Sequence, residues 1–600
     1  MCGIAGLYSL SERPDPQARL RDMARMVASM NHRGPDGEGV WSSRNGRCVL
    51  GHRRLSIVDL SHAGQQPMVS DSGREVIAFN GEVYNFLELR DALERQGETF
   101  RSRSDTEVLL KGLVREGPNF LTRLDGMFAL ALYDETRDEV LLARDMFGEK
   151  PLYFTLVDEV IAFASEIGAL QSLPGFDSTI TRDEVGLYLA FQMVPGARTI
   201  YSNVRRLLPG HMVRISARGV SDPLPFGTLD CHSGEAPASM KEAADELEAH
   251  LSTAIQRRLI ADVPVGCFLS GGVDSSTTTA IAVRRLGTPI KTFSIGFQGE
   301  AYSEYEQALE MARHLGTDHV AMDMPPVTYR DLIDTVATID EPNFDSSCAP
   351  TWLVSQLARQ HVTVALTGDG GDELFGGYGR YQETMFEAGR RPYEMKRREW
   401  HAGMDYSRRV LVFREADVGQ LLGQVPSSLS DTMLAYRRYI DTSAAPLVHR
   451  LRMSDVSFYL PVVLAKVDRM SMKHSLECRT PFFAPEVVDF ARRLPPDLLV
   501  SGGYGKAVLR EVATRHFPRD WIYREKRGFG LSPAQREVAS GLLTRLRERL
   551  RDGSCRLVAF MPADKLKASL DGWLSERGFY HTWALLLLDL WLERNPWRTA

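Results

Sequence analysis

This 600-residue sequence has no long hydrophobic run. The longest apolar stretch near the C-terminus covers 584–592 and is interrupted by Asp589. A helix that spans a bilayer needs about 20 consecutive, mostly apolar residues. The sequence therefore predicts no membrane-spanning helix, and it favours a buried terminal helix over 584–592.

The sequence also has no excess of positive charge, since its formal net charge is -6. A protein that binds nucleic acid usually carries a basic domain or stripe, so we expect no nucleic-acid partner. The fractions of hydrophobic residues, 44%, and of charged residues, 25%, are typical of a globular protein. At 600 residues the chain exceeds the size of one hydrophobic core, so two or more domains are expected.

Cysteine is scarce, and its spacing forms neither a zinc motif nor a disulfide framework. The count is seven, an odd number at irregular positions. This pattern favours a reducing cytoplasm, which would keep Cys2 as a thiol, and a signal peptide is not expected if Cys2 becomes the first residue. Cys267, Cys348 and Cys478 lie in apolar or motif-adjacent segments and are interpreted as small buried residues.

Cys2 is the first residue with clear catalytic potential. Removal of Met1 would leave a terminal residue with both a thiol and a free α-amino group. The α-amino group has an unperturbed pKa of about 7.7–8.0 and can accept the thiol's proton while the sulfur attacks a carbonyl. Alone, Cys2 is weak evidence of a catalytic role, because an ordinary small residue after an initiator methionine is the commoner case.

Four motifs follow Cys2 within about the first hundred residues. They are Asn31-His32-Arg33-Gly34-Pro35-Asp36-Gly37, the run 51–59, Phe79-Asn80-Gly81-Glu82-Val83-Tyr84-Asn85, and Arg103-Ser104-Asp105. In this order they resemble the class II (N-terminal nucleophile) glutamine amidotransferases. Phe79-Asn80-Gly81 is also typical of a hairpin turn, and both interpretations can hold together.

The resemblance implies how glutamine would bind. An arginine suits the α-carboxylate of glutamine, and acidic groups suit its α-ammonium. Preorganised donors stabilise the negative charge that develops on the amide oxygen during attack by sulfur. The matching positions are Arg54 for the carboxylate, Glu82 and Asp105 for the ammonium, the Asn80 side chain and the Gly81 amide for the oxyanion, and Leu55, Ile57 and Val58 around the substrate.

A second stretch, 265–276, is an apolar strand-like run that breaks into Ser270-Gly271-Gly272-Val273-Asp274-Ser275. Glycines let backbone amides approach an anion, hydroxyls add donors, and the N-terminus of the next helix attracts negative charge. The Gly-Lys-Ser/Thr ending of a Walker A loop is missing. The run resembles instead the pyrophosphate loop of ATP pyrophosphatases that form acyl-adenylates.

A third run, 364–378, again places a strand before a turn rich in glycine and carboxylates. Mg²⁺ often binds beside nucleotides through one or two carboxylates and the substrate phosphates. The resemblance implies Asp274 and Asp372 as Mg²⁺ ligands. Asp369 stands where some relatives have a glutamate tied to acyl-adenylate formation, although a turn aspartate is an alternative. The positions that match the family's contacts with adenosine are Leu269, Ile295, Thr367 and Gly368.

Lys506, within 502–511, matches the family segment whose lysine faces the α-phosphate during adenylation. A lysine can supply a point charge there. The run 524–530 is also similar to the family and is either a basic loop near phosphates or a solvated face.

Together these motifs resemble the glutamine-hydrolysing asparagine synthetase family over nearly the whole chain. The resemblance implies an N-terminal nucleophile domain over 2–215 with an αββα sandwich, and an ATP-pyrophosphatase domain over 241–600. It implies ATP as a substrate, Mg²⁺, a homodimer, and small-molecule substrates that are glutamine, ATP and aspartate or another carboxylate. Ammonia from the Cys2 site would cross an internal tunnel to the acyl-adenylate.

The residue patterns agree with this α/β architecture. Short apolar runs that alternate with turns, such as Val76-Ile77-Ala78-Phe79 and 127–133, suggest antiparallel sheets covered by helices. Residues 216–240 have the composition of a linker. Strand-like 289–295 and 362–366 alternate with helical patterns, which predicts a doubly wound parallel sheet with ligands at its carboxyl edge. Beyond about residue 380 the pattern is mostly helical.

Two departures from the family leave the acceptor open. Relatives commonly have a polar pair after Leu-Pro where this chain has Val462-Val463, and Ala484 replaces an aspartate. Either the acceptor pocket or only the core packing has changed. The candidates are aspartate, a specialised carboxylate, an internal amide made by a cyclase of the β-lactam or lasso-peptide type, and a non-catalytic scaffold. Cys2 and the intact carboxylates count against the last two.

Overall fold

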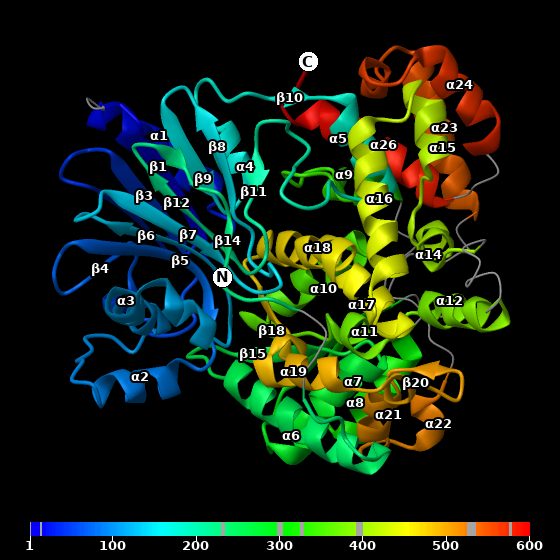
Figure 1. The fold of residues 1–600 in the computed structure, drawn as a ribbon, viewed down its shortest axis with the longest axis horizontal. Helices are drawn as coiled ribbons and strands as arrows, with labels where there is room; N and C mark the ends of the chain where they lie inside the picture. Colours follow the sequence, from blue (N-terminus) through cyan, green and yellow to red (C-terminus); the bar gives the residue numbers. More distant parts are fainter. Residues whose placement is uncertain are drawn as a thin grey trace.

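The computed structural model describes residues 2–11, 15–229, 234–296, 304–323, 329–391, 400–524, 536–574 and 579–600. Its first half contains two antiparallel sheets that lie face to face (Figure 1). The first has the order β11 (Arg205–Arg206), β8 (Tyr153–Val157), β9 (Val160–Ala164), β1 (Gly3–Ser9), β3 (Cys48–Arg54) and β2 (Gly37–Ser42). The second has the order β13 (Gly219–Val220), β12 (His211–Ser216), β7 (Glu139–Arg144), β6 (Gly126–Asp134), β5 (Glu75–Val83) and β4 (Met68–Val69).

Apolar residues of the two sheets pack against one another in the space between the sheets. On the outer face of each sheet, apolar residues pack against helices. Ile4 and Phe163 from the first sheet pack with Ala78 and Tyr133 from the second. Helix α1 (Pro16–Ser29) covers the outer face of the first sheet, and α2 (Phe86–Glu94) and α3 (Asp105–Glu116) cover that of the second. The predicted αββα sandwich is therefore confirmed.

Two sequence interpretations in this half need correction. β13 and β14 (Leu224–Pro225) both pair with β12, so the first part of the expected linker 216–240 belongs to the second sheet. Residues 230–233 of that linker lie outside the described residues. The hairpin-turn interpretation of Phe79-Asn80-Gly81 is wrong, because Asn80 and Gly81 lie inside β5 and pair with Ala129 and Phe128 of β6.

The second half contains a parallel sheet, as predicted. Its order is β17 (Asp318–Asp323), β16 (Lys291–Gly296), β15 (Val265–Phe268), β18 (Val364–Leu366) and β19 (Glu477–Arg479). Because the chain adds β16 and β17 on one side of β15 and β18 and β19 on the other, the winding reverses between β15 and β18. Ligands in open α/β sheets bind beyond the carboxyl ends of strands at such a switch.

Helices cover both faces of this sheet. Cys267 and Leu366 point into a core with α6 (Met240–Arg258), while Phe293 and Ala365 point into a core with α10 (Cys348–Arg359). This arrangement is the doubly wound fold expected from the sequence. The expected strand 362–366 is shorter than predicted, because Val362 and Thr363 precede β18.

The remainder of the chain is mainly helical, from α12 (Gly379–Arg390) to α26 (Phe579–Arg594). The predicted buried terminal helix is confirmed: α26 is buried along most of its length, and Trp583 and Trp591 donate indole hydrogen bonds to Phe344 O (3.1 Å) and Ile339 O (2.8 Å). Among the described residues, no helix combines the length and apolarity needed to cross a bilayer.

Candidate functional site

Cys2 lies at the start of β1, where the two sheets meet, and its side chain is buried. Its backbone nitrogen donates to Asn80 Oδ1 at 3.1 Å, and its Sγ lies 4.0 Å from the Leu55 carbonyl oxygen. Its own carbonyl oxygen accepts a hydrogen bond from Arg33 Nε at 3.0 Å. Three segments far apart in the sequence thus fix the position of the candidate nucleophile.

Strand β5 carries the predicted oxyanion donors. Asn80 Nδ2 lies 3.4 Å from Ser165 Oγ, which also accepts from the Ile4 amide at 3.0 Å. Gly81 has no room for a side chain, because an added Cβ would lie 2.1 Å from the Met127 carbonyl oxygen. The Asn80 side chain therefore lies beside Cys2, and the close approach of β6 requires glycine at the next position.

The predicted acidic groups gather in a buried charge cluster. Arg479 Nη2 lies 3.3 Å from Glu82 Oε1, and Arg479 Nε donates to Glu477 Oε1 at 2.6 Å. Burial raises the pKa of Asp105 to about 6, although the amides of Val83 and Thr106 oppose this shift. Burial, followed by the negative charge of Glu477, also raises the pKa of Glu82. These carboxyls are poised for a cationic partner such as an ammonium group.

The same environment controls the Cys2 thiol. Burial raises the pKa of Cys2 to about 11, and the charges of Glu477 and Glu82 add to the increase. The thiol is therefore neutral near pH 7 and needs a base close to its sulfur before it can attack.

Arg54, which is predicted to bind the α-carboxylate of glutamine, contacts the loop that follows β3. Its Nη1 donates to Ser61 O at 2.9 Å, and its Nη2 donates to Asp59 O. Leu55 and Ile57 are buried against Val364 of β18, and Val58 is half-buried at the edge of that cluster. The predicted glutamine-binding loop thus rests on the amino end of the parallel sheet.

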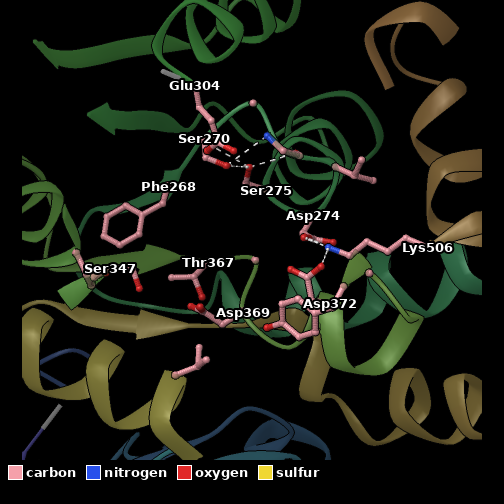
Figure 2. Close-up of a pocket in the computed structure, with 18 of the residues that line it drawn as sticks. Phe268, Ser270, Asp274, Ser275, Glu304, Ser347, Thr367, Asp369, Asp372 and Lys506 are labelled. Carbon is pink, nitrogen blue, oxygen red and sulfur yellow. Dashed lines mark hydrogen bonds and ion pairs between the residues drawn. The ribbon is translucent and has the colours of Figure 1, made fainter. Parts of the chain in front are cut away.

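The second predicted site surrounds a cavity of about 510 Å³ at the carboxyl ends of β15 and β18 (Figure 2). Gly272 precedes α7 (Val273–Ala280), so the loop leads directly into a helix N-terminus. Ser270 Oγ lies 3.1 Å from Ser275 Oγ and accepts from the Gly272 amide at 3.2 Å. Gly271, at φ +82°, approaches Gln307 so closely that a Cβ would lie 2.8 Å from the Gln307 Cβ. This is the geometry expected of an anion cradle.

Lys506 joins the predicted carboxylates. Its Nζ lies 2.5 Å from Asp274 Oδ2 and 2.8 Å from Asp372 Oδ1, and the three side chains converge at one end of the cavity (Figure 2). Burial alone would lower the pKa of Lys506, but the charges of Asp274 and Asp372 raise it. Lys506 has φ +58° at the start of α21 (Ala507–Thr514), a left-handed conformation that is rare for a residue with a side chain.

The two carboxylates are suitable Mg²⁺ ligands. Asp274 and Asp372 approach the same cationic nitrogen, so their oxygens can share one centre of positive charge. Among the described residues no group of three or more metal-binding side chains occurs, so a metal ion here would need phosphate oxygens to complete its shell. The donor chemistry therefore fits Mg²⁺ bound together with ATP.

The remaining predicted ATP-site residues separate into two groups. Thr367, Gly368 and Asp369 line the cavity, and Thr480 Oγ1 donates to the Asp369 carbonyl oxygen at 2.7 Å. Leu269 and Ile295 are buried and do not line it. Arg524 lines the cavity, whereas 525–530 of the predicted basic run lie outside the described residues.

The structure adds cavity residues that motif reasoning did not single out. Lys466, from α18 (Leu460–Met472), lines the cavity and donates to Ser347 Oγ at 3.1 Å. Tyr378 also lines it and donates to the buried Glu373 Oε1 at 2.7 Å. Tyr378 and Glu373 lie within the run 364–378, and Lys466 closely follows the unusual Val462-Val463 pair. Proximity to these motifs was the only feature of the sequence that could have indicated them as cavity residues.

The two departures from the family have different surroundings. Val463 lines the cavity, next to Lys466 on the same helix. Ala484 is buried in a hydrophobic core with Phe482 and Val487. The change at Val463 therefore alters the cavity wall, whereas the change at Ala484 alters core packing.

A continuous set of buried contacts connects the two sites. Arg33 Nη1 and Nη2 donate to Asp468 Oδ2 (2.8 Å) and Oδ1 (3.0 Å), and Asp468 belongs to the cavity-lining helix α18. Strand β19 begins at Glu477, whose charge acts on Cys2, and is followed by Thr480, which contacts Asp369. At about 3.3 Å per residue, Glu477 and Thr480 are separated by roughly 10 Å along the strand.

Comparison with known proteins gives a consistent result. The family model described as "Asparagine synthase" matches residues 246–593, and the one described as "Glutamine amidotransferase domain" matches residues 1–225. The chain is 32% identical to a glutamine-hydrolysing asparagine synthetase of Bacillus subtilis over 561 residues, which cover 88% of this chain and 87% of that protein. It is 32% identical to asparagine synthetase B of Escherichia coli over 400 residues, which cover 63% of this chain and 65% of that protein.

A solved structure of the allosteric regulatory enzyme of purine biosynthesis aligns with 55% of this chain and 82% of that chain. Its sequence identity is 19% and its TM-score is 0.30, values too low to support an argument about this protein.

Proposed function

Because this chain belongs to the asparagine synthase family, we propose that it is a two-site ligase that converts aspartate to asparagine through an acyl-adenylate. Glutamine-dependent amidation and the use of ATP as a substrate follow from the family. One observation carries the proposal: a Cys2–Asn80 site and a Lys506–Asp274–Asp372 site occur in one chain, joined by buried contacts.

At the first site, Cys2 is proposed to attack the side-chain amide of glutamine. Once Met1 has been removed, the Cys2 nitrogen becomes an amine that can accept the thiol's proton, which a thiol with a pKa of about 11 requires. Asn80 and the Gly81 amide stabilise the oxyanion, and Glu82 and Asp105 pair with the α-ammonium. Arg54 binds the α-carboxylate, with Leu55, Ile57 and Val58 around the substrate. The products are glutamate and ammonia.

At the second site, the loop 270–275 is proposed to bind the phosphates of ATP, with Thr367 and Gly368 toward adenosine. Leu269 and Ile295 match the family's contacts on the adenosine side. Asp274 and Asp372 would hold Mg²⁺, which neutralises phosphate charge when bound. Lys506 faces the α-phosphate, and Asp369 takes part in the formation of the acyl-adenylate. Pyrophosphate leaves, and ammonia then displaces AMP from the acyl-adenylate to give the amide.

A specialised carboxylate is the second candidate acceptor, and Val463 is the observation that favours it. An apolar side chain occupies the cavity wall where relatives commonly have a polar residue, so the acceptor has one polar partner fewer there. A cyclase is disfavoured, because such cyclases commonly lose the terminal cysteine, whereas Cys2 is present here and lies buried against Asn80. A homodimer is part of the proposal, and analytical ultracentrifugation of the purified protein tests it.

Pyrophosphate release by the purified protein with Mg-ATP and glutamine, with aspartate added or omitted, tests the proposal. Aspartate-dependent pyrophosphate release with equal asparagine formation is expected. In Cys2→Ala, glutamine-dependent turnover should vanish while ammonia-dependent turnover remains. Loss of both would contradict the two-site mechanism. Glutaminase activity without any response to aspartate would redirect the search to another carboxylate.

A further inference from the structure

Lys466 differs from the other buried lysines of this protein. Four lysines are buried in the part of the chain that the structure describes. Three of them form an ion pair with at least one carboxylate: Lys111, Lys150 and Lys506. Lys466 makes no ion pair with any described residue, and its Nζ has one hydrogen bond, to Ser347 Oγ at 3.1 Å. Because a buried charge is costly unless it is paired, Lys466 is suited to an anionic group of a ligand.

The ammonium group of Lys466 lies at the wall of the synthetase cavity. Both Lys466 and Ser347 line the cavity. The Ser347 side chain lies on the same side of the cavity as Thr367 and Asp369, across from Lys506 (Figure 2). Since Lys466 Nζ contacts the Ser347 hydroxyl, its charge is at this end of the cavity.

Ser347 is held so that its oxygen accepts from Lys466. The Ser347 hydroxyl donates to Asp345 Oδ1 at 2.7 Å, and the Ser347 amide donates to the same oxygen at 2.8 Å. The hydroxyl hydrogen is thus already used, and a lone pair of Ser347 Oγ faces the ammonium. An ammonium group has three donor hydrogens. Two of those of Lys466 therefore remain for a ligand, which matches the two oxygens of a carboxylate.

The electrostatics of this wall favour an anion. Burial lowers the pKa of Lys466, but the negative charges of Asp345 and Asp369 outweigh this effect and raise it, so Lys466 stays cationic. Helix α10 begins directly after Ser347, and its amino end adds the positive end of the helix dipole.

Val463 adds an apolar surface beside this charge. It precedes Lys466 by three positions in α18, and residues three apart lie on the same face of a helix. Both side chains line the cavity. A cation next to an apolar side chain fits a short carbon chain that carries an anionic group at its end.

We propose that Lys466 and Ser347 bind a second anionic group of the acceptor, so that the acceptors of this enzyme are dicarboxylic acids. This inference rests on the proposed function and names the acceptor class of the synthetase site. The reacting carboxylate lies toward Lys506, the second carboxylate lies toward Lys466, and Val463 packs against the carbon chain. Aspartate belongs to this class. Lys466 determines specificity and takes no part in the transfer of the adenylyl group.

The comparison of aspartate with its α-amide, isoasparagine, tests this role. Isoasparagine keeps the side-chain carboxylate that reacts but lacks the second charge. In wild type, kcat/KM for exchange between pyrophosphate and ATP should be about 100-fold higher with aspartate, because loss of one partner of a buried charge pair typically costs about that factor. Lys466→Met should lower exchange with aspartate by about 100-fold but exchange with isoasparagine by less than about threefold, with KM for ATP unchanged. Equal losses with both acceptors would overturn the inference.

Two further variants control for a general effect on the fold. Lys466→Arg keeps a cation at the wall and should recover part of the exchange with aspartate. Lys473→Met is the matched control, because Lys473 is half-buried at the end of α18 and does not line the cavity. It should behave as wild type, and all three variants should keep glutaminase activity. If Lys466→Met does not fold, equal use of aspartate and isoasparagine by wild type would still overturn the inference.

A binding measurement separates this inference from the choice of aspartate. The full chain is mixed with Mg²⁺ and α,β-methylene-ATP, which cannot form the adenylate, and then with succinate or propionate. A ligand that binds only the folded protein raises its Tm. Succinate should raise the Tm more than propionate at equal concentration, and Lys466→Met should abolish the difference. Equal shifts in wild type would overturn the inference. A larger shift with succinate but no exchange with aspartate would support it and count against aspartate as the acceptor.

Discussion

Removal of the charge of Asp468 should loosen the Cys2 site from the synthetase half. Asp468 accepts both guanidinium hydrogen bonds of Arg33, at 2.8 and 3.0 Å, and Arg33 Nε donates to the Cys2 carbonyl oxygen. Asp468→Asn keeps the side-chain shape and removes the charge. Arg33, which is 0% exposed, then keeps Glu166 at 2.8 Å as its anionic partner.

The magnitude follows from two independent arguments. Burial raises the pKa of Asp468, but the charges of Arg33 and Lys150 outweigh it and hold the pKa at about 2, below the usual 3.8. This depression corresponds to about 2 kcal/mol of stability, which is present above pH 3.8 and is lost as the pH falls through about 2. Removal of one partner of a buried pair typically costs about 3–5 kcal/mol. With Glu166 still in place, we expect a loss of about 3 kcal/mol.

Urea unfolding at neutral pH measures this loss in the full chain. The matched control is Asp489→Asn, which removes a surface pair with Arg492 and should cost at most about 1 kcal/mol. Because Arg33 positions Cys2, glutamine-dependent turnover should also fall about tenfold while ammonia-dependent turnover is retained. Surface pairs contribute at most about 1 kcal/mol. If the free energy of unfolding of Asp468→Asn lay within that range of the value for Asp489→Asn, the reasoning would be refuted.

Three further predictions concern the two sites. Since an ionised Asp105 is needed to pair with an α-ammonium and its pKa is about 6, the KM for glutamine should rise below pH 6; steady-state assays of Asp105→Asn should lack this rise. Lys506→Met should lower pyrophosphate exchange by about 100-fold without changing glutaminase activity, and equal losses in both assays would contradict this role. Gly371→Ala should impair exchange, because its Cβ would lie 2.5 Å from Asp274 Oδ1, whereas Gly379→Ala, with open space around its Cβ, should behave as wild type.

The sequence predicted those parts of both sites that depend on short contiguous motifs. Ser270–Ser275 follows β15 and Asp372 follows β18, and parallel strands bring their carboxyl ends to one edge. Lys506 lies 232 residues from Asp274 and could be assigned only through the family resemblance. The order of apolar runs was sufficient to predict both sheet types, because short runs separated by turns favour antiparallel strands, whereas strand-like runs that alternate with helical patterns favour a parallel sheet.

The sequence could not predict the contacts that join the two halves. Arg33 and Asp468 are 435 positions apart, and neither has a local signal that identifies its partner. The Asn80-Gly81 pair was misleading for a related reason: its turn propensity is overridden by pairing with β6 along the whole of β5. The contact between Glu373 and Tyr378 was also not predicted, because it depends on the burial of Glu373 and on the position of the Tyr378 hydroxyl.

The buried ion pairs between the halves also limit how this chain can diverge from its relatives. Arg33–Asp468, Arg206–Glu341 and Arg258–Asp125 each join a residue of the sandwich half to a residue of the synthetase half. A substitution on one side leaves an unpaired charge whose cost is a large fraction of the roughly 5–15 kcal/mol that keeps a typical protein folded. A glutaminase half transplanted from a relative would therefore fold well against this synthetase half only if it brought the matching charges, so that both halves are inherited as a single unit.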